Sequence, residues 1–254
     1  MISRTAVYVL WLREMKRYSR AKSRIIGSLI QPLFFLAFLG LGFNRMAVPG
    51  VAAGVNYIRF LVPGIIGMTL LFSSSMQGLS VLWDREFGFL KEIMVAPVGR
   101  VSIVLGRIAG GTTTTMIQGL LVFGLSFFLG FRISRGPYLL MALVFMILIA
   151  FTFIGLGLIF ASKMKDMQGF GLIINFIIFP LFFLSGALYP IKNLPWIIRV
   201  LSYIDPLTYG IDGLRGSLIN VASLPILLNL AAMAGFSLVM LFLGAYFFEK
   251  SESV

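Results

Sequence analysis

Residues 136–162 read GPYLLMALVFMILIAFTFIGLGLIFAS and contain no charged side chain. A helix rises about 1.5 Å per residue, so a run of this length can cross a hydrocarbon core about 30 Å thick. Inside lipid every backbone polar group needs a partner within the protein, and a helix supplies these partners from its own turns. The stretch therefore predicts a membrane-spanning helix.

Five further uncharged runs repeat this pattern elsewhere in the chain. They cover residues 25–43, 60–83, 108–131, 167–191 and 216–248. The first of them exceeds the roughly 7–15 apolar residues of a cleaved signal peptide, which favours a retained span. The last exceeds one crossing, and Pro225 predicts that its helix begins near Ser223 or Leu224. The pattern predicts an all-α integral membrane protein with six transmembrane helices.

The composition agrees with lipid as the main solvent. Of the 254 residues, 59% are hydrophobic and 12% are charged, whereas soluble domains are roughly 25% charged. Cysteine and histidine are absent, which excludes disulfides, thiolate nucleophiles, imidazole bases and the usual zinc ligands. The predicted spans also contain no Asp, Glu, Lys or Arg, which argues against a proton-coupled or ion-coupled carrier. We therefore expect neither an enzyme nor a cofactor bound by this chain.

The positive charges indicate how the chain is oriented. The formal net charge is +12, from 21 Lys and Arg against 9 Asp and Glu. With the N-terminus in the cytoplasm, 14 cations lie inside and 7 outside, which agrees with the positive-inside rule. The inside set comprises seven cations before residue 25, four between residues 84 and 107, and Lys163, Lys165 and Lys250. Both termini are therefore predicted to be cytoplasmic. Because the cations lie beside apolar runs, where anionic lipid attracts them, nucleic acid is not an expected partner.

The first 24 residues predict an amphipathic helix that lies in the membrane interface. Its aromatic face repeats at spacings of three and four, with Tyr8, Trp11, Met15 and Tyr18. The opposite face carries Arg13, Arg17, Arg20 and Arg24. We expect the aromatic side chains at head-group depth and the arginines at lipid phosphate or at an acidic partner surface. Alternatively, the positive charge only orients the first span.

The connection between the second and third spans, residues 83–107, reads WDREFGFLKEIMVAPVGRVSIVLGR. It is short, mixed in charge and cytoplasmic in the predicted topology. Leu90, Ile93 and Met94 are spaced for one face of a helix that Pro97 ends. Such a helix projects from the two spans, and another protein can move the spans by binding to it. Alternatively, the segment is a charged loop lying on the membrane. No GxxxxGK[ST] phosphate loop occurs in the chain, so ATP hydrolysis would need another protein.

Residues 185–220, which we call the outer segment, read SGALYPIKNLPWIIRVLSYIDPLTYGIDGLRGSLIN. Pro195 and Pro206 stand where helices can start, and Asp205 is placed to cap the second helix. We expect that second helix to be interrupted by three glycines, Gly210, Gly213 and Gly216. The segment lies outside in the predicted topology but is too apolar for an ordinary solvated loop.

Two arrangements are compatible with the outer segment. We predict an outer re-entrant helical hairpin over residues 192–220 that dips into the outer leaflet, where protein surrounds its backbone. Alternatively, the segment is a loop on the membrane surface, held by the interfacial aromatics Tyr189, Trp196 and Tyr203.

Two of these stretches carry a resemblance that extends over essentially the whole chain. They are DREFGFLKEIMVAPVGR, from residue 84, and FLSGALYPIKNLPWIIRVLSYIDPLTYGIDGLR, from residue 183. The chain resembles the type-2 ABC transporter permeases, especially the branch that exports drugs and other amphiphiles. The resemblance implies one transmembrane permease domain over residues 1–254, with an N-terminal interfacial helix over residues 1–24.

The resemblance also implies roles for particular residues. A cytoplasmic coupling helix over residues 84–100 would dock into an ATPase through Asp84, Arg85, Glu86, Gly88, Leu90, Glu92, Pro97 and Arg100. The interfacial helix, with Trp11, Arg13, Arg17 and Arg20, would lie at the same contact. An outer gate would include Tyr189, Pro190, Pro195, Asp205, Pro206 and Arg215. Many relatives have Gly-Thr where this chain has Gly88-Phe89, so this contact is expected to be more apolar here.

The implied function is that of the permease subunit of an ATP-binding cassette exporter in a prokaryotic plasma membrane. Such a subunit moves a drug-like, lipid-like or glycolipid substrate outward, and ATP and magnesium bind the separate ATPase subunit. The implied partners are that ATPase, membrane lipids, and a second copy in a homodimer or a related permease. Alternative functions are an ATPase-independent channel or carrier and a membrane assembly scaffold.

Overall fold

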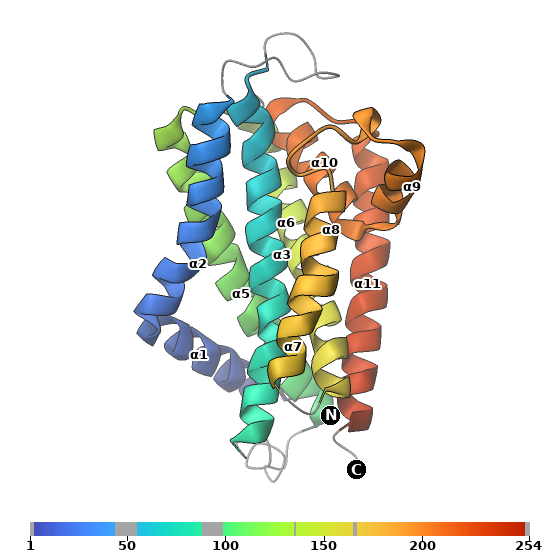
Figure 1. Ribbon diagram of the computed structural model, residues 1–254. Coiled ribbons are helices and arrows are strands. Elements are labelled where there is room, and N and C mark those ends of the chain that lie inside the picture. Colours follow the sequence, from blue (N-terminus) through green and yellow to red (C-terminus); the bar gives the residue numbers. More distant parts are fainter. Residues whose placement is uncertain (1–2, 44–54, 88–98, 135, 165–166, 252–254) are drawn as a thin grey trace.

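The computed structural model describes residues 3–43, 55–87, 99–134, 136–164 and 167–251. The longer helices run side by side as a bundle, and α1 lies across one end of it (Figure 1). The helices are α1 (Arg4–Arg20), α2 (Lys22–Phe35), α3 (Tyr57–Glu86), α5 (Arg100–Ser126), α6 (Leu139–Lys163), α7 (Met167–Ile173), α8 (Phe179–Leu184), α9 (Trp196–Ile204), α10 (Pro206–Ile219) and α11 (Ile226–Ser251). The shorter turns are the π-helices η1 (Leu36–Leu41) and η4 (Ile174–Ile178) and the 3-10 helices η2 (Phe127–Leu129), η3 (Gly136–Tyr138) and η5 (Ile191–Asn193). The all-α class is confirmed.

Four of the described helices are long and apolar enough to cross a membrane. They are Tyr57–Asp84, Val101–Leu129, Gly136–Lys163 and Ile226–Phe248. A fifth results if Arg4–Arg20 and Ile25–Leu41, bent by 70° at their junction, are counted together as one broken span. Gly169–Leu184 is a shorter apolar helix. The chain is therefore a membrane protein with four to five such helices by this measure, and the six-span arrangement stays a prediction.

The run predicted over residues 167–191 forms a shorter helix than expected. It is helical through α7, η4 and α8, and it ends at Leu184. Gly186 has a positive φ of 70°, and the Ser185 hydroxyl donates to the carbonyl of Phe182 2.6 Å away. The chain turns there, although the following residues remain apolar, because glycine adopts this conformation without steric cost. Apolar composition alone does not reveal such a turn.

Close contacts between small residues hold the centre of the bundle together. A Cβ atom on Gly78 of α3 would lie 2.2 Å from the carbonyl oxygen of Gly157 of α6. A Cβ atom on Gly155, also on α6, would lie 2.4 Å from the carbonyl oxygen of Met240 of α11. Helices in lipid gain stability mainly from such close packing, because lipid tails are as apolar as the side chains they would replace. Glycines therefore place α6 directly against α3 and α11.

The expected interruption of the second outer helix is wrong. Helix α10 is continuous from Pro206 to Ile219. Gly210 and Gly213 instead face Ile149 and Phe145 of α6, and a Cβ atom on Gly213 would lie 2.3 Å from the Phe145 ring. Gly216 faces Ala222, in the segment before α11. Gly210 and Gly213 thus allow α10 to approach α6 closely, a role that the sequence pattern does not distinguish from a helix break.

Candidate functional site

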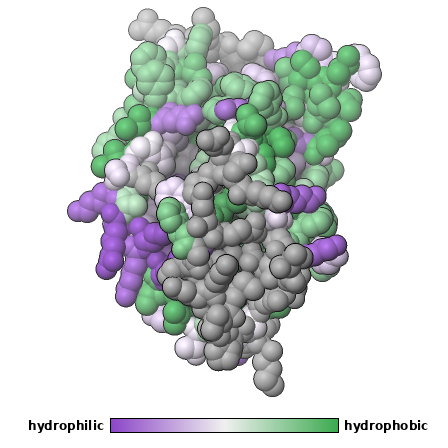
Figure 2. Space-filling model, turned by 60° about the horizontal axis from the view of Figure 1, so that its bottom comes forward, coloured by the Kyte–Doolittle hydropathy of each residue, from purple (hydrophilic) through white to green (hydrophobic). Residues whose placement is uncertain are grey.

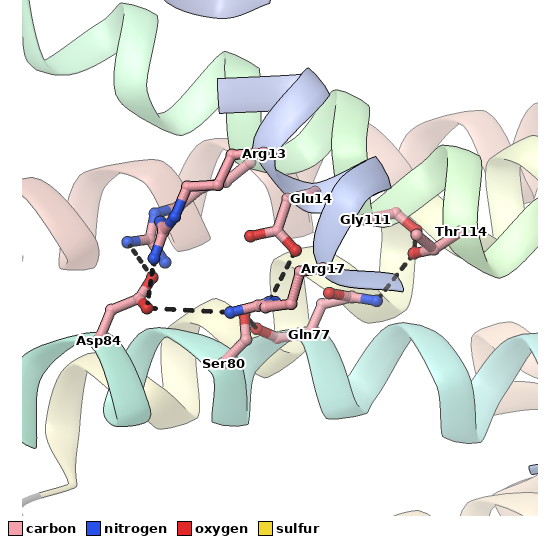
Figure 3. Close-up of polar contacts among 9 residues, drawn as sticks. Arg13, Glu14, Arg17, Gln77, Ser80, Asp84, Gly111 and Thr114 are labelled. Atoms are coloured by element: carbon pink, nitrogen blue, oxygen red, sulfur yellow. Dashed lines mark hydrogen bonds and ion pairs between the residues drawn. The ribbon is translucent and has the colours of Figure 1, made fainter. Parts of the chain in front are cut away.

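Asp84 joins three helices near the end of α3. Its side chain is buried, with 7% exposed. The Arg13 guanidinium of α1 lies 2.9 Å from Asp84 Oδ1, and that of Arg107 of α5 lies 2.8 Å from Oδ2. Figure 3 shows Arg13 and Arg17 reaching down from α1 to Asp84 on α3. One carboxylate therefore ties α1, α3 and α5 together.

A second carboxylate completes what we call the Asp84 cluster. Its members are Arg13, Glu14, Arg17, Asp84 and Arg107. Arg17 lies 2.7 Å from Glu14 and 3.8 Å from Asp84, so it connects the two acids. Removal of one partner from a buried ion pair typically costs about 3–5 kcal/mol, because the remaining charge stays buried without compensation. The cluster therefore fixes the position of α1 against the bundle.

Packing and hydrogen bonds reinforce the attachment of α1 to α5. The Trp11 indole donates to the Thr113 hydroxyl 3.1 Å away, and the Ser3 amide donates to the Ser102 hydroxyl 2.9 Å away. A Cβ atom on Gly106 would lie 2.7 Å from the Cβ of Leu10. Only a glycine lets the backbone of α5 approach α1 this closely.

These contacts add to the expectation for the face of α1. The Trp11 indole donates to Thr113 of α5, and Arg13 and Arg17 pair with carboxylates of the same chain. The contact of these residues with head groups or with a partner stays a prediction. Lys16 and Arg20 are exposed. Figure 2 shows hydrophilic side chains gathered on one side of the end where α1 lies. The interfacial position of α1 stays a prediction.

The predicted coupling helix lies mostly outside the described residues. Gly88, Leu90, Glu92 and Pro97 belong to that part of the chain. Arg85 and Glu86 are the last residues of α3, and Arg100 is the first residue of α5. Asp84 is the first residue of the predicted coupling helix and lies in the last turn of α3, and Arg107 lies two turns beyond Arg100 in α5. The Asp84 cluster thus sits at the base of the predicted coupling helix.

The outer segment contains the two short helices that the sequence predicts. Pro195 precedes α9, and Asp205 caps α10, where its side chain accepts a hydrogen bond from the Leu207 amide 2.9 Å away. Pro206 is the first residue of α10. Burial raises the pKa of the Asp205 carboxyl to about 8, against the opposing effect of the Leu207 amide. The two helix starts and the cap are confirmed, whereas their depth in the membrane stays a prediction.

Arg215 connects the outer segment to α3. Its guanidinium donates to the carbonyls of Gly186 and Ala187, each 2.8 Å away, and to that of Phe60 at 3.2 Å. It also lies 3.7 Å from the centroid of the Phe60 ring. Arginine can satisfy several carbonyls at once because its donors are arranged in a planar fork. The buried guanidinium therefore holds α10, the turn after α8 and the start of α3 in one arrangement.

The remaining predicted gate residues lie in the loop before η5. The Tyr189 hydroxyl donates to the carbonyl of Phe183, and partial burial raises its pKa. Pro190 follows it and precedes η5. The Tyr57 hydroxyl of α3 donates to the carbonyl of Leu188 3.0 Å away. The loop is thus attached to both α8 and α3.

Sequence reasoning missed three residues of these sites. Glu14 and Arg107 belong to the Asp84 cluster, and Asp212 accepts hydrogen bonds from the Ser223 and Leu224 amides. A signal was available for two of them. Glu14 is the single acidic residue among the first 24, and Arg107 directly precedes a predicted span just as Asp84 directly follows one. Opposite charges at the same end of consecutive antiparallel spans are placed to pair.

The sequence is similar to known proteins over a range that includes both the Asp84 cluster and most of the outer segment. The family model described as ABC-2 type transporter matches residues 5–219. The inner membrane transport permease YadH of Escherichia coli strain K12 is 27% identical over 235 residues, which are 91% of this chain and 90% of that protein. The putative transport permease ycf38 of Porphyra purpurea is 30% identical over 200 residues, 77% of this chain and 68% of that protein. Nodulation protein J of Sinorhizobium fredii is 25% identical over 244 residues, 95% of this chain and 92% of that protein.

Proposed function

The chain belongs to the ABC-2 type transporter family, and from this premise we propose that it is the membrane-spanning permease subunit of an ATP-binding cassette exporter. ATP and magnesium bind a separate ATPase subunit in this proposal, and the coupling helix over residues 84–100 contacts that subunit. The chain lies in the plasma membrane with both termini in the cytoplasm. Its substrate is a drug-like, lipid-like or glycolipid molecule that moves outward.

The observation that supports this proposal most directly is the position of Asp84. It is the first residue of the predicted coupling helix, and it is bonded to Arg13 of α1 and to Arg107 of α5. A force applied to the coupling helix therefore reaches α1, α3 and α5 together. This arrangement suits a subunit that receives its energy from another protein, because the coupling helix and the helices α1, α3 and α5 would move together.

Two copies of the chain, or one copy and a related permease, form the transport path in this proposal. Helices α3 and α7–α8 line the path, and the outer segment closes it on the far side. Buried hydrogen bonds of Arg215 and Asp205 support this part of the proposal, because they hold the outer segment in one arrangement. Opening would require these contacts to move as a unit, since a buried guanidinium without partners is costly.

The proposal is tested with the purified chain and a P-loop ATPase expressed beside it. We expect the two to co-purify and inside-out vesicles to accumulate a lipophilic fluorescent dye only with ATP. Charge reversal of Glu86 and Glu92 to Lys should uncouple ATP hydrolysis from dye uptake, whereas reversal of Lys192, exposed in the outer segment, should not. If both reversed variants transport normally and still bind the ATPase, the coupling assignment is wrong.

The same vesicles distinguish the alternative functions. Dye movement that is equal with and without ATP would identify an ATPase-independent channel or carrier. A stable complex with the ATPase in which no transport of any tested amphiphile depends on this chain would identify an assembly scaffold.

A further inference from the structure

A cavity of about 200 Å³ lies beside α10, at the end of the bundle opposite α1 (Figure 1). We call it the outer cavity. Its walls come from the start of α3, the end of the turn after α8, η5, α10 and the residues between α10 and α11. It exceeds the roughly 10–15 Å³ that one water needs but is smaller than the roughly 300–1,000 Å³ of sites for drug-sized molecules. The outer cavity is therefore of a size for a small ion or a single polar group.

Arg215 presents an unused donor to the outer cavity. The residue lines the cavity, although it is only 5% exposed. Its Nε and Nη2 atoms donate to three backbone carbonyls, whereas its third nitrogen, Nη1, donates to no described residue. Unlike Nη1 of Arg107, this Nη1 is not fully enclosed by protein. Because a buried donor without a partner is costly, a ligand that accepts from Arg215 Nη1 would be stabilised.

The charges around the outer cavity favour an anion. Lys192 of η5 and Arg215 of α10 contribute two positive charges, and Asp212 contributes the single carboxylate among the lining residues. The Asp212 carboxylate already accepts hydrogen bonds from two backbone amides and from the Asn229 side chain. The cavity therefore has one cation in excess, and its carboxylate is occupied by donors of the protein.

The Asp212 carboxylate does not fully offset the burial of the Arg215 guanidinium. Burial lowers the pKa of Arg215 to about 10, against the opposing effects of Asp212 and Tyr57. The guanidinium is still charged at neutral pH, but it has lost most of its water. An anion beside it would form a charge-assisted hydrogen bond, which is roughly twice as strong as a neutral one.

Two uncharged polar side chains extend this set of donors. Asn220, which follows α10, and Ser223 both line the outer cavity and are exposed. An oxyanion has several acceptor oxygens and can contact such donors together with an arginine and a lysine, which are the usual protein partners of phosphate. The cavity thus matches the size and the hydrogen bonding of one phosphate group.

From these observations we propose that the outer cavity binds a phosphate group, whose oxygens accept from Arg215 Nη1 and from the Lys192 ammonium. The group is either a free phosphate ion or the phosphate of a lipid head group, which offer the same chemistry. Bound phosphate links η5 to α10 and so stabilises the described arrangement of the outer segment. The inference rests on the proposed function in one respect, since the predicted topology places the cavity on the outer side of the membrane.

Two measurements on the purified chain in an uncharged maltoside detergent test the proposal. Equilibrium dialysis against radiolabelled orthophosphate measures binding of the free ion. Native mass spectrometry after addition of phosphatidylglycerol measures binding of the lipid, with a diacylglycerol glucoside as the matched lipid without phosphate. We expect saturable binding of one phosphate group per chain in at least one measurement, and retention of the glucoside at least about tenfold weaker than that of phosphatidylglycerol.

The two measurements also identify the source of the phosphate. Saturable binding of orthophosphate assigns the cavity to the free ion. Retention of phosphatidylglycerol without binding of orthophosphate assigns it to a lipid head group. Whichever ligand binds should also raise the unfolding temperature of the chain, because a ligand of the folded state stabilises that state.

Variants connect this binding to the outer cavity without removing the Arg215 hydrogen bonds that hold the outer segment. Ser223→Glu should weaken phosphate binding at least about tenfold, because it places a second carboxylate beside the anion. Ser223→Gln is the uncharged control of the same size and should bind as the unmodified chain does. Lys192→Ala should also weaken binding, whereas Arg132→Ala, which removes an exposed cation that does not line the cavity, should not.

Absence of saturable binding in both measurements, or equal binding by Ser223→Glu and Ser223→Gln, overturns the proposal. Neither measurement needs an ATPase, so this result is separate from the test of the proposed function. A chain that binds phosphate but neither co-purifies with an ATPase nor supports export would remove the exporter assignment alone. A chain that exports with ATP but binds phosphate in neither measurement would remove the outer cavity assignment alone.

Discussion

The carboxylate of Asp84 and the guanidinium of Arg107 lie 2.8 Å apart and are each about 7% exposed. Asp84 lies in the last turn of α3 and is the first residue of the predicted coupling helix, and Arg107 lies two turns into α5, beyond the end of that helix. Their pairing closes the base of that connection, and Arg13 adds α1 to it. The contact point with the proposed ATPase is therefore anchored in a buried ion cluster rather than in a solvated loop.

Asp84→Asn should destabilise the chain by about 3–5 kcal/mol, because Arg107 would remain buried without its counter-charge. Arg13→Gln is the matched control, since Asp84 keeps Arg107 at 2.8 Å when the partly exposed Arg13 is removed; its cost should be about 1 kcal/mol or less. Thermal unfolding of the purified variants in detergent measures both. Equal stability of Asp84→Asn and the unmodified chain would show that the cluster does not stabilise the bundle.

Arg215→Lys should lower stability by about 2–3 kcal/mol although it keeps the charge, because an ammonium group cannot serve three carbonyls in the arginine geometry. Arg132 is exposed, so Arg132→Lys should have almost no effect. Thermal unfolding and protease accessibility of the outer segment provide the measurements. If the two substitutions behave alike, Arg215 does not hold the outer segment.

Asp205→Asn should be tolerated better than Asp205→Ala, because asparagine still accepts the Leu207 hydrogen bond whereas alanine loses about 1–2 kcal/mol of capping. The folded pKa of about 8 lies above the ordinary 3.8, so the folded state binds a proton that the unfolded state has lost. The contribution of Asp205 to stability is therefore full below the ordinary pKa and falls as the pH rises through about 8.

The pH dependence provides a second test of Asp205. Between about pH 6 and about pH 9, the unmodified chain should lose stability relative to Asp205→Asn, which has no carboxyl to ionise at this position. Parallel melting curves for the two proteins across this range would contradict the raised pKa.

Gly78→Ala should destabilise the bundle by about 1–3 kcal/mol, because its Cβ atom would lie 2.2 Å from the backbone of α6 and force the helices apart. Gly124→Ala is the control, since a Cβ atom there meets nothing within 4 Å. Alanine at that helical position should raise stability by up to about 1 kcal/mol. Thermal unfolding that moves in the same direction for both would exclude this packing role.

Single cysteines test the orientation, because the chain has none of its own. Phe87→Cys, at a position that is 75% exposed, should react with a membrane-impermeant thiol reagent only from the cytoplasmic side. Lys192→Cys should react only from outside. Labelling of Phe87→Cys from the outside would invert the topology and remove the coupling assignment.

The sequence predicted the long helices well but not their ends. Absence of charge identifies a span, so the predicted runs end just before Asp84 and begin just after Arg107. The structure continues α3 and α5 past these residues, since each charge is compensated by the other across two helices. A span predicted from one segment of sequence cannot include a charge whose partner lies on another segment.

Predictions for the outer segment also fail where a residue's role depends on a partner in another part of the sequence. Prolines and Asp205 specify helix starts locally, and those predictions were right. The roles of Gly213 and Arg215 depend on Phe145 and Phe60, which are distant in the sequence, so no local pattern predicts them. The coupling residues between 88 and 98 lie outside the described part of the chain, and their roles remain predictions.

The 70° bend between the first two helices has a mechanical consequence. Because the two helix axes are far from parallel, a shift of α1 along its own axis displaces the start of α2 mostly sideways. Such a shift would therefore tilt α2 rather than move it along the membrane normal. Gln31 of α2 lines a cavity of about 500 Å³ whose other walls come from α1, α3, α5 and the α7–α8 stretch, so this sideways motion would widen or narrow the cavity without any helix unwinding.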